Sequence, residues 1–219
     1  MESSSSQPRK DIWNVPNILT ISRILFSLLV FLLFPFHFYL TCFVLFIVGA
    51  ITDFLDGWWW ARKFHLVTQF GRIVDSFADK TLVCGSYIYL VANPDLHNLF
   101  PPCEGSSCPF ANIPLGLPTW TVVVVILREL LVTMLRSLIE AGGGDFSAKW
   151  VGKWKATFQF INIPMGILIL RYLNQTGAAP CWLKVGFLIT LYAVVFLTLY
   201  SGWVYIKAAT KLLKTQNKD

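Results

Sequence analysis

Four aspartates are concentrated in the stretch TDFLDGWWWARKFHLVTQFGRIVDSFADK, residues 52–80. They are Asp53, Asp56, Asp75 and Asp79. Residues three or four positions apart share a face of a helix, so Asp53 pairs with Asp56, and Asp75 pairs with Asp79. Clustered carboxylates repel one another unless protons or cations neutralise them. Hard divalent ions, Mg²⁺ or Mn²⁺, suit such oxygen ligands, and nothing in the stretch suggests zinc.

A metal site of this kind would support phosphoryl transfer. A carboxylate-held ion with open positions binds substrate phosphate and stabilises charge on the transferring group. Gly57 and Gly71 in the same stretch allow close approach of the backbone, and Arg62 offers a planar fork for phosphate. The alternative is that the aspartates are solvated helix ends, or that they pair with neighbouring arginines and lysines.

The elements that would position these aspartates are membrane spans. The chain is 55% hydrophobic, 16% aromatic and 14% charged, whereas soluble domains are about 25% charged. Six apolar stretches are each about long enough to cross 30 Å of hydrocarbon. They are residues 15–35, 38–54, 73–91, 119–139, 157–172 and 185–208. The sequence therefore predicts an all-α polytopic membrane protein, a six-transmembrane-helix bundle with the aspartates where the second and third spans meet.

The distribution of basic residues predicts the orientation of this bundle. Lysines and arginines concentrate on one side of it: Arg9, Lys10, Arg62, Lys63, Arg72, Lys149, Lys153, Lys155, Lys207, Lys211, Lys214 and Lys218. Such residues favour the cytoplasm, so both termini and the aspartates should face it. The net charge of +6 then reflects topology and anionic lipid rather than nucleic-acid binding. We expect a disordered polar tail at 1–14, a membrane domain at 15–208 and a basic tail at 209–219.

The aspartate stretch resembles the signature of the CDP-alcohol phosphotransferase (phosphatidyltransferase) family, D-x2-D-G-x2-A-R-x8-G-x3-D-x3-D. The matching residues are Asp53, Asp56, Gly57, Ala61, Arg62, Gly71, Asp75 and Asp79. One departure is the run of three tryptophans between Gly57 and Ala61, where the family has two residues. The extra residue is either absorbed as a helical bulge, a feature common at functional sites, or displaces Arg62.

The resemblance implies a membrane enzyme that moves the phosphatidyl group of CDP-diacylglycerol to an alcohol and releases CMP. It implies two divalent ions on Asp53, Asp56 and Asp75, with Asp79 sharing the site and acting as the general base. It assigns Gly57, Ala61, Arg62 and Gly71 to the cytidine diphosphate portion of CDP-diacylglycerol. We further expect Asn17 and Arg23 in the first span to help bind the nucleotide or lipid phosphates of this donor. Asn17 could equally cap a helix. Members of the family are often dimers, so a homodimer is an expectation from the resemblance alone.

Other stretches concern the acceptor alcohol. Four stretches, NVPNILTISRI, DSFADK, ILRELLVTMLRSL and GKWKATFQ, resemble the phosphatidylglycerophosphate synthases of this family. This resemblance implies glycerol 3-phosphate as the acceptor and a bacterial inner membrane, with a mitochondrial membrane as the alternative. Arg128 and Arg136 share a broad helix face, Lys153 and Lys155 begin the fifth span, and these cations suit the phosphate dianion of that acceptor. Alternatively, the lysines only mark the cytoplasmic side, and Arg136 extends to the interface.

Three competing functions remain open at this point. A cardiolipin synthase of the same family would share the aspartate motif but accept phosphatidylglycerol. A membrane prenyltransferase also presents aspartates to Mg²⁺ and a diphosphate, but lacks this continuous motif. In an ion transporter or channel, acidic residues should spread along several spans, whereas here they gather at one face.

Cys103 and Cys108 lie in the predicted non-cytoplasmic loop, where a disulfide between them would need an oxidising compartment.

Overall fold

The computed structural model describes residues 15–55, 69–99, 116–141 and 150–216, and every regular element in these ranges is a helix. The long helices are α1 (Val15–Leu33), α2 (Tyr39–Leu55), α4 (Gln69–Ala92), α5 (Thr119–Ala141), α6 (Trp150–Thr176) and α7 (Cys181–Gln216). Two short 3-10 helices, η1 (Phe34–Phe36) and η3 (Pro94–Leu96), follow α1 and α4. The predicted all-α class is confirmed for these ranges, and each predicted span coincides with one long helix.

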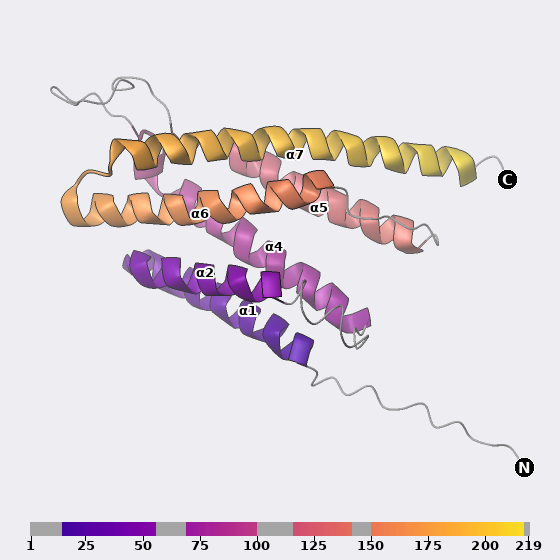
Figure 1. The fold of residues 1–219 in the computed structure, drawn as a ribbon, viewed down its shortest axis with the longest axis horizontal. Coiled ribbons are helices and arrows are strands. Elements are labelled where there is room, and N and C mark those ends of the chain that lie inside the picture. The colour runs from indigo at the N-terminus through magenta and orange to yellow at the C-terminus, as the bar shows by residue number, and fades with distance from the viewer. Residues whose placement is uncertain (1–14, 56–68, 100–115, 142–149, 217–219) are drawn as a thin grey trace, which may run out of the picture.

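Successive long helices run in opposite directions (Figure 1). The starts of α1, α4 and α6 and the ends of α2, α5 and α7 therefore lie at one end of the molecule, on the right in Figure 1. We call it the aspartate end, because Asp53 lies in the last turn of α2, and Asp75 and Asp79 lie in the first half of α4. The opposite end holds η1, η3 and the connection from α6 to α7.

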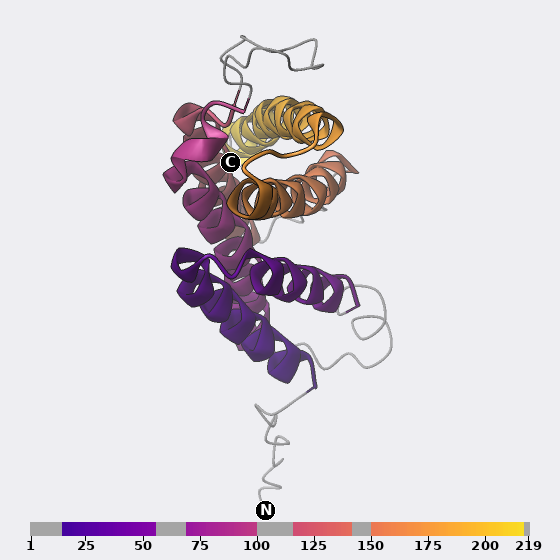
Figure 2. The same cartoon turned by 90° about the vertical axis from the view of Figure 1, so that its left-hand side faces the viewer.

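The helices form two groups that α4 joins (Figure 2). One group is the pair α1 and α2, the other comprises α5, α6 and α7, and α4 contacts both. Gly85 allows the close approach of α1 and α4, since a Cβ there would lie 2.0 Å from Cζ of Phe31. The groups also meet directly between α2 and α6, where the rings of Phe46 and Phe160 are 6.2 Å apart.

Many large apolar side chains are exposed on the outside of this bundle, while several polar and charged side chains are buried within it beside the apolar core. Leu32, Phe196 and Trp182 are more than 60% exposed, whereas Arg23 and Lys155 are buried. Exposed apolar side chains together with buried charged ones are expected in a lipid environment, where charged residues within the membrane face the interior of the bundle. Within the described ranges, Trp154–Thr176 and Cys181–Lys207 are long and apolar enough to cross a membrane. The chain is an integral membrane protein.

A buried polar junction around Asn162 fixes α6 against its neighbours. Its amide oxygen accepts a hydrogen bond from the Tyr87 hydroxyl on α4 (3.1 Å), and its amide nitrogen donates to the Phe187 carbonyl on α7 (2.9 Å). The same nitrogen donates to Oγ1 of Thr190 (2.8 Å). Buried polar groups are costly unless they are hydrogen-bonded, so the junction favours one register of α4, α6 and α7.

Two helices extend beyond the predicted spans at the aspartate end. Helix α6 begins at Trp150, before the span predicted from 157, and α7 continues to Gln216. Most of the segment expected to be a basic tail is thus helical, because lysine, alanine, leucine and glutamine favour helices outside the bilayer as well. At the other end of α7, Cys181 is disulfide-bonded. Cys103 and Cys108 lie outside the described residues.

Candidate functional site

The backbone brings the aspartate positions of α2 and α4 to the same end of two contacting helices. The helices meet where a Cβ on Gly49 would lie 3.1 Å from Cδ2 of Leu82. Asp53 lies about one turn beyond this contact along α2, and Asp79 lies about one turn beyond it along α4 in the antiparallel direction. Asp75 lies one further turn toward the aspartate end.

Much of the predicted metal and nucleotide site lies outside the described residues. This holds for Asp56, Gly57, Ala61 and Arg62, and for the extra tryptophan. The side chains of the other predicted residues Asn17, Asp53, Asp75, Asp79, Arg136 and Lys153 also lie outside, although their backbones are helical, as is that of Gly71. Among the described side chains, no three of His, Cys, Asp or Glu could hold a metal ion. The aspartates supply oxygen donors alone, which fits Mg²⁺ or Mn²⁺.

Arg23 is the predicted nucleotide-site residue whose side chain the structure describes. It lies in the first half of α1 and is fully buried. The Ser27 hydroxyl donates to its backbone carbonyl (2.8 Å), so the serine satisfies its own hydroxyl within the helix. An arginine at this depth needs polar or charged surroundings in the bundle interior. Its predicted role in binding CDP-diacylglycerol stays a prediction.

A second group of charged residues joins α5, α6 and α7. Nη2 of Arg128 on α5 donates to Oγ of Ser201 on α7 (2.7 Å), and Nη1 lies 3.4 Å from Oε2 of Glu129. The other carboxylate oxygen of Glu129 forms an ion pair with Nζ of Lys155 on α6. The Arg128 guanidinium also lies 5.6 Å from the centre of the Tyr205 ring on α7. We call these five residues the cationic junction.

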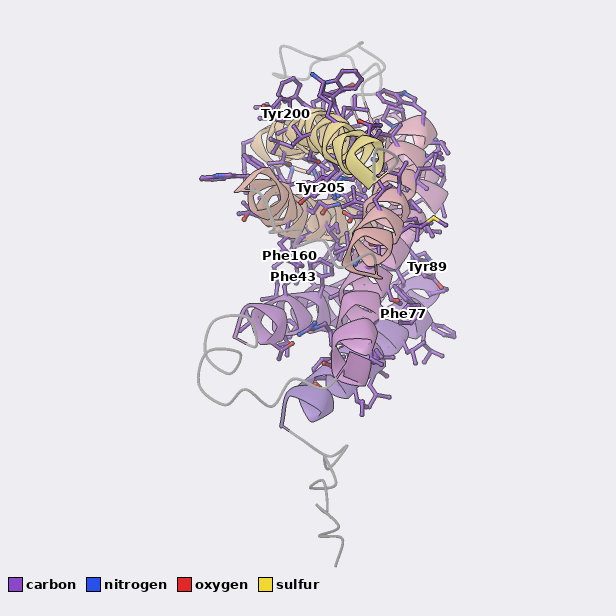
Figure 3. The ribbon with its side chains drawn as sticks, turned by 90° about the vertical axis from the view of Figure 1, so that its right-hand side faces the viewer. Phe43, Phe77, Tyr89, Phe160, Tyr200 and Tyr205 are labelled. Carbon is purple, nitrogen blue, oxygen red and sulfur yellow. The ribbon has the colours of Figure 1, made fainter. Side chains whose placement is uncertain are left out.

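Figure 3 shows the inward and outward faces of α7 near the cationic junction. Tyr205 lies among the helices, while Tyr200 lies on the outer side of α7. The inward face of α7 also carries Ser201, which is buried and donates to the Thr198 carbonyl (3.1 Å). The inward face of α7 therefore supplies both a hydroxyl and an aromatic ring to Arg128.

The described side chains of the cationic junction carry more positive than negative charge and have little access to water. Lys155 is 1% exposed, and the side chains of Arg128 and Glu129 are 11% and 15% exposed. Among the side chains that the structure describes here, two cations and one carboxylate leave a formal charge of +1. Within the described part of the chain, Nε of Arg128 and Nε2 of Gln159, one turn after Lys155, have no hydrogen-bond partner. Buried donors and surplus charge favour an anion at this place.

The structure brings together two of the four residues predicted to bind the acceptor phosphate. Arg128 and Lys155 share the Glu129 carboxylate. Sequence reasoning did not assign Glu129, Ser201 or Tyr205. Glu129 was visible as an acid beside an arginine in an apolar run, whereas Ser201 and Tyr205 gave no signal, because contacts between helices do not follow from spacing within one helix.

A family model described as CDP-alcohol phosphatidyltransferase matches residues 13–212. The chain belongs to the CDP-alcohol phosphatidyltransferase family. The family prediction made from the aspartate stretch is thereby confirmed, and so is the enzyme class, a transferase of phospholipid synthesis.

Several curated proteins resemble the chain over nearly its whole length. The CDP-diacylglycerol–glycerol-3-phosphate 3-phosphatidyltransferase of Bacillus subtilis is 30% identical over 94% of this chain and 100% of its own length. The protein of the same name from Rickettsia bellii is 31% identical, over 90% of this chain and 96% of its own length. The probable phosphatidylglycerophosphate synthase of Mycobacterium tuberculosis is 30% identical, over 96% and 88%.

Proposed function

We propose that the chain transfers the phosphatidyl group of CDP-diacylglycerol to sn-glycerol 3-phosphate, which yields phosphatidylglycerol phosphate and CMP. The main support is the near full-length similarity to proteins that carry the name of this activity. The cationic junction adds independent support. A phosphorylated acceptor carries a dianion that arginine and lysine bind strongly, whereas serine or inositol would not need these cations.

The aspartates at the ends of α2 and α4 would supply the reaction chemistry. Asp53, Asp56, Asp75 and Asp79 would hold two divalent ions, which when bound stabilise charge on the phosphate oxygens during an in-line displacement. Asp79 would accept the proton of the attacking glycerol 3-phosphate hydroxyl. The new P–O bond forms at the phosphorus that carries the diacylglycerol, and the bond from this phosphorus to the CMP oxygen breaks.

The remaining predicted residues would orient the two substrates. Asn17, Arg23, Gly57, Ala61, Arg62 and Gly71 would bind the cytidine diphosphate portion of the donor. Arg128, Arg136, Lys153 and Lys155 would bind the acceptor phosphate. Of these, the structure gives direct support to the joint use of Arg128 and Lys155, because they lie on different helices and meet at one carboxylate.

We further propose that all six long helices span the membrane, with the aspartate end in the cytoplasm of a bacterial cell. Exposed Trp182 and Trp203 lie about 31 Å apart along α7, close to the thickness of the hydrocarbon core, and tryptophan favours both interfaces. Lys207, Lys211 and Lys214 follow Trp203, as expected on the cytoplasmic side. The disulfide of Cys181 at the other end suits an oxidising compartment.

The acceptor can be tested by CMP release from CDP-diacylglycerol with purified protein and Mg²⁺ or Mn²⁺. The arms are glycerol 3-phosphate, phosphatidylglycerol, inositol phosphate, serine and no acceptor. We expect release that depends on glycerol 3-phosphate. Release with phosphatidylglycerol alone would instead indicate a cardiolipin synthase, and release that needs no acceptor would contradict the transfer.

A further inference from the structure

Glu129 occupies a central position in the cationic junction. Each of its carboxylate oxygens contacts a different cation, Oε1 with Lys155 and Oε2 with Arg128. These cations come from α6 and α5, and Arg128 reaches onward to Ser201 on α7. One carboxylate therefore joins two of the residues that our proposed function assigns to the acceptor phosphate.

A carboxylate beside an anion site needs a physical reason, because it repels the anion that the site binds. The lysine side chain is long and flexible, and its ammonium is a point charge with no fixed direction. Lys155 is also almost fully buried, so its charge has lost most of its hydration. Glu129 contacts the ammonium with one oxygen and the guanidinium with the other. The charges of the described residues in the junction still sum to +1.

The described residues do not satisfy every hydrogen-bond donor of Arg128. Nη1 contacts Glu129 and Nη2 contacts Ser201, while Nε is buried and without a hydrogen-bond partner among the described residues. Gln159, one turn after Lys155 on α6, likewise has a buried amide nitrogen without such a partner. Glu129 thus holds both cations without satisfying every buried donor in their neighbourhood.

We propose that Glu129 is a positioning residue, whose carboxylate holds the Arg128 guanidinium and the Lys155 ammonium in the geometry that binds the acceptor phosphate. This inference rests on the proposed function for the identity of the acceptor. Glu129 acts through the two cations and does not contact the reacting atoms. Its removal should therefore affect the use of the acceptor and leave the use of CDP-diacylglycerol unchanged.

The first test compares wild type, Glu129→Gln and Glu129→Asp in steady-state kinetics. In Glu129→Gln we expect the KM for glycerol 3-phosphate to rise about tenfold to a hundredfold, the scale of a lost charged hydrogen bond. The KM for CDP-diacylglycerol should stay within about twofold. Glu129→Asp keeps the charge and should recover part of the loss. An unchanged or lowered KM for glycerol 3-phosphate in Glu129→Gln would overturn the proposal, since it would make the carboxylate a bystander or a competitor.

A double variant tests whether Glu129 acts through Lys155. Glu129→Gln should lower the Tm, because it removes the carboxylate that pairs with the buried Lys155 charge. Lys155→Met in the same chain removes that charge and should restore part of the Tm. If Glu129 positions the lysine, its loss should raise the KM for glycerol 3-phosphate less in the Lys155→Met background than in the wild type. An equal rise in both backgrounds would show that Glu129 acts independently of Lys155, which would overturn the proposal.

Asn162→Ala is a matched control for general loosening of the bundle. It removes buried hydrogen bonds between the same α6 and its neighbours, but Asn162 carries no charge and its described hydrogen bonds go to Tyr87, Phe187 and Thr190, outside the cationic junction. We expect a lower Tm with an unchanged KM for glycerol 3-phosphate. A rise in this KM similar to that of Glu129→Gln would show that any weakening of α6 has the same effect, which would overturn the specific role.

A binding measurement without turnover keeps this test separate from the proposed reaction. In EDTA, glycerol 3-phosphate should raise the Tm of the wild type and of Asn162→Ala, and should raise that of Glu129→Gln much less. An equal rise in all three proteins would contradict positioning. If the wild type uses another phosphate-bearing alcohol instead, the proposed function fails. Glu129 is then judged on that alcohol, where a raised KM supports the role and an unchanged KM overturns it.

Discussion

At the scale of single residues, the contacts of Arg128 require an arginine rather than a lysine at this position. Its two terminal nitrogens have different partners on different helices, Glu129 on α5 and Ser201 on α7, and its plane lies near the Tyr205 ring. Arginine can do this because its guanidinium is a rigid planar fork, whereas a lysine presents one compact charge. The same positive charge in a lysine would therefore not hold these contacts together.

Replacing Arg128 by lysine should consequently impair acceptor use despite the conserved charge. We expect the KM for glycerol 3-phosphate to rise about tenfold, because one charged hydrogen bond of the fork is lost. Ser201→Ala, which removes the acceptor of the Nη2 hydrogen bond, should give a smaller rise. Thr210→Ala is the matched control on α7, since its exposed hydroxyl donates to the backbone carbonyls of Ile206 and Lys207 within the same helix. Wild-type kinetics in Arg128→Lys would show that the fork is not needed.

At the scale of helices, the packing of α1 on α4 depends on a glycine. A Cβ on Gly85 would lie 2.0 Å from Cζ of Phe31, whose ring also stacks on Tyr89 at 5.6 Å. Phe31 would have to leave this position, and overpacking of this kind costs about 1–3 kcal/mol. We expect Gly85→Ala to lower the Tm of the purified protein.

Gly202→Ala provides the comparison for this substitution. A Cβ there would lie 3.6 Å from Cγ of Arg128, which is ordinary van der Waals contact. Because alanine favours helices by about 1 kcal/mol over glycine, its Tm should be equal to or above that of the wild type. An equal Tm for Gly85→Ala and wild type would mean that α1 and α4 do not need this close approach.

The helices themselves were largely predictable, because hydropathy along one chain reports each span directly. Apolar runs located α1, α2, α4 and α5 to within a few residues. The continuation of α6 back to Trp150 and of α7 on to Gln216 was not predictable from apolarity, because charged residues continue a helix equally well outside the bilayer.

The aspartate part of the candidate site was more predictable from the sequence than the cationic junction. The aspartate motif and the family follow from local spacing, and the antiparallel course of α2 and α4 agrees with the expected meeting of Asp53 and Asp79 at one end. The pairing of Lys155 with Glu129 was not predictable, since it depends on how two different helices, α5 and α6, pack against each other. The same applies to Ser201, whose role depends only on how α7 packs against α5.

At the scale of the whole molecule, the exposed apolar side chains and the charge distribution support the proposed orientation in the membrane. Apolar side chains cover the outside, and the lysines that follow Trp203 mark one end. With the helices alternating in direction, the proposed six spans would place the start of α1 and the end of α7 on that side. The soluble acceptor would then reach the site from the cytoplasm, while the lipid donor approaches within the bilayer.

This orientation can be measured with reporters fused after the last residue of the chain. Green fluorescent protein should fluoresce there, since it folds in the cytoplasm, and alkaline phosphatase should be inactive, since it needs the oxidising periplasm. The same pair inserted in the connection between α6 and α7, after Gly177, should give the opposite result. Active alkaline phosphatase at the C-terminus would invert the proposed membrane topology and place the aspartate end outside the cytoplasm.

The central claim is tested most directly by the transfer of isotope-labelled glycerol 3-phosphate into lipid. Purified wild type and Asp79→Asn would be compared with CDP-diacylglycerol, in EDTA and after addition of excess Mg²⁺ or Mn²⁺. We predict a labelled lipid with the mass of phosphatidylglycerol phosphate, formed only with metal, and a loss of at least about a hundredfold in Asp79→Asn, the scale of a lost general base. Equal labelling by the folded variant, or labelling in EDTA, would contradict the role assigned to the aspartates.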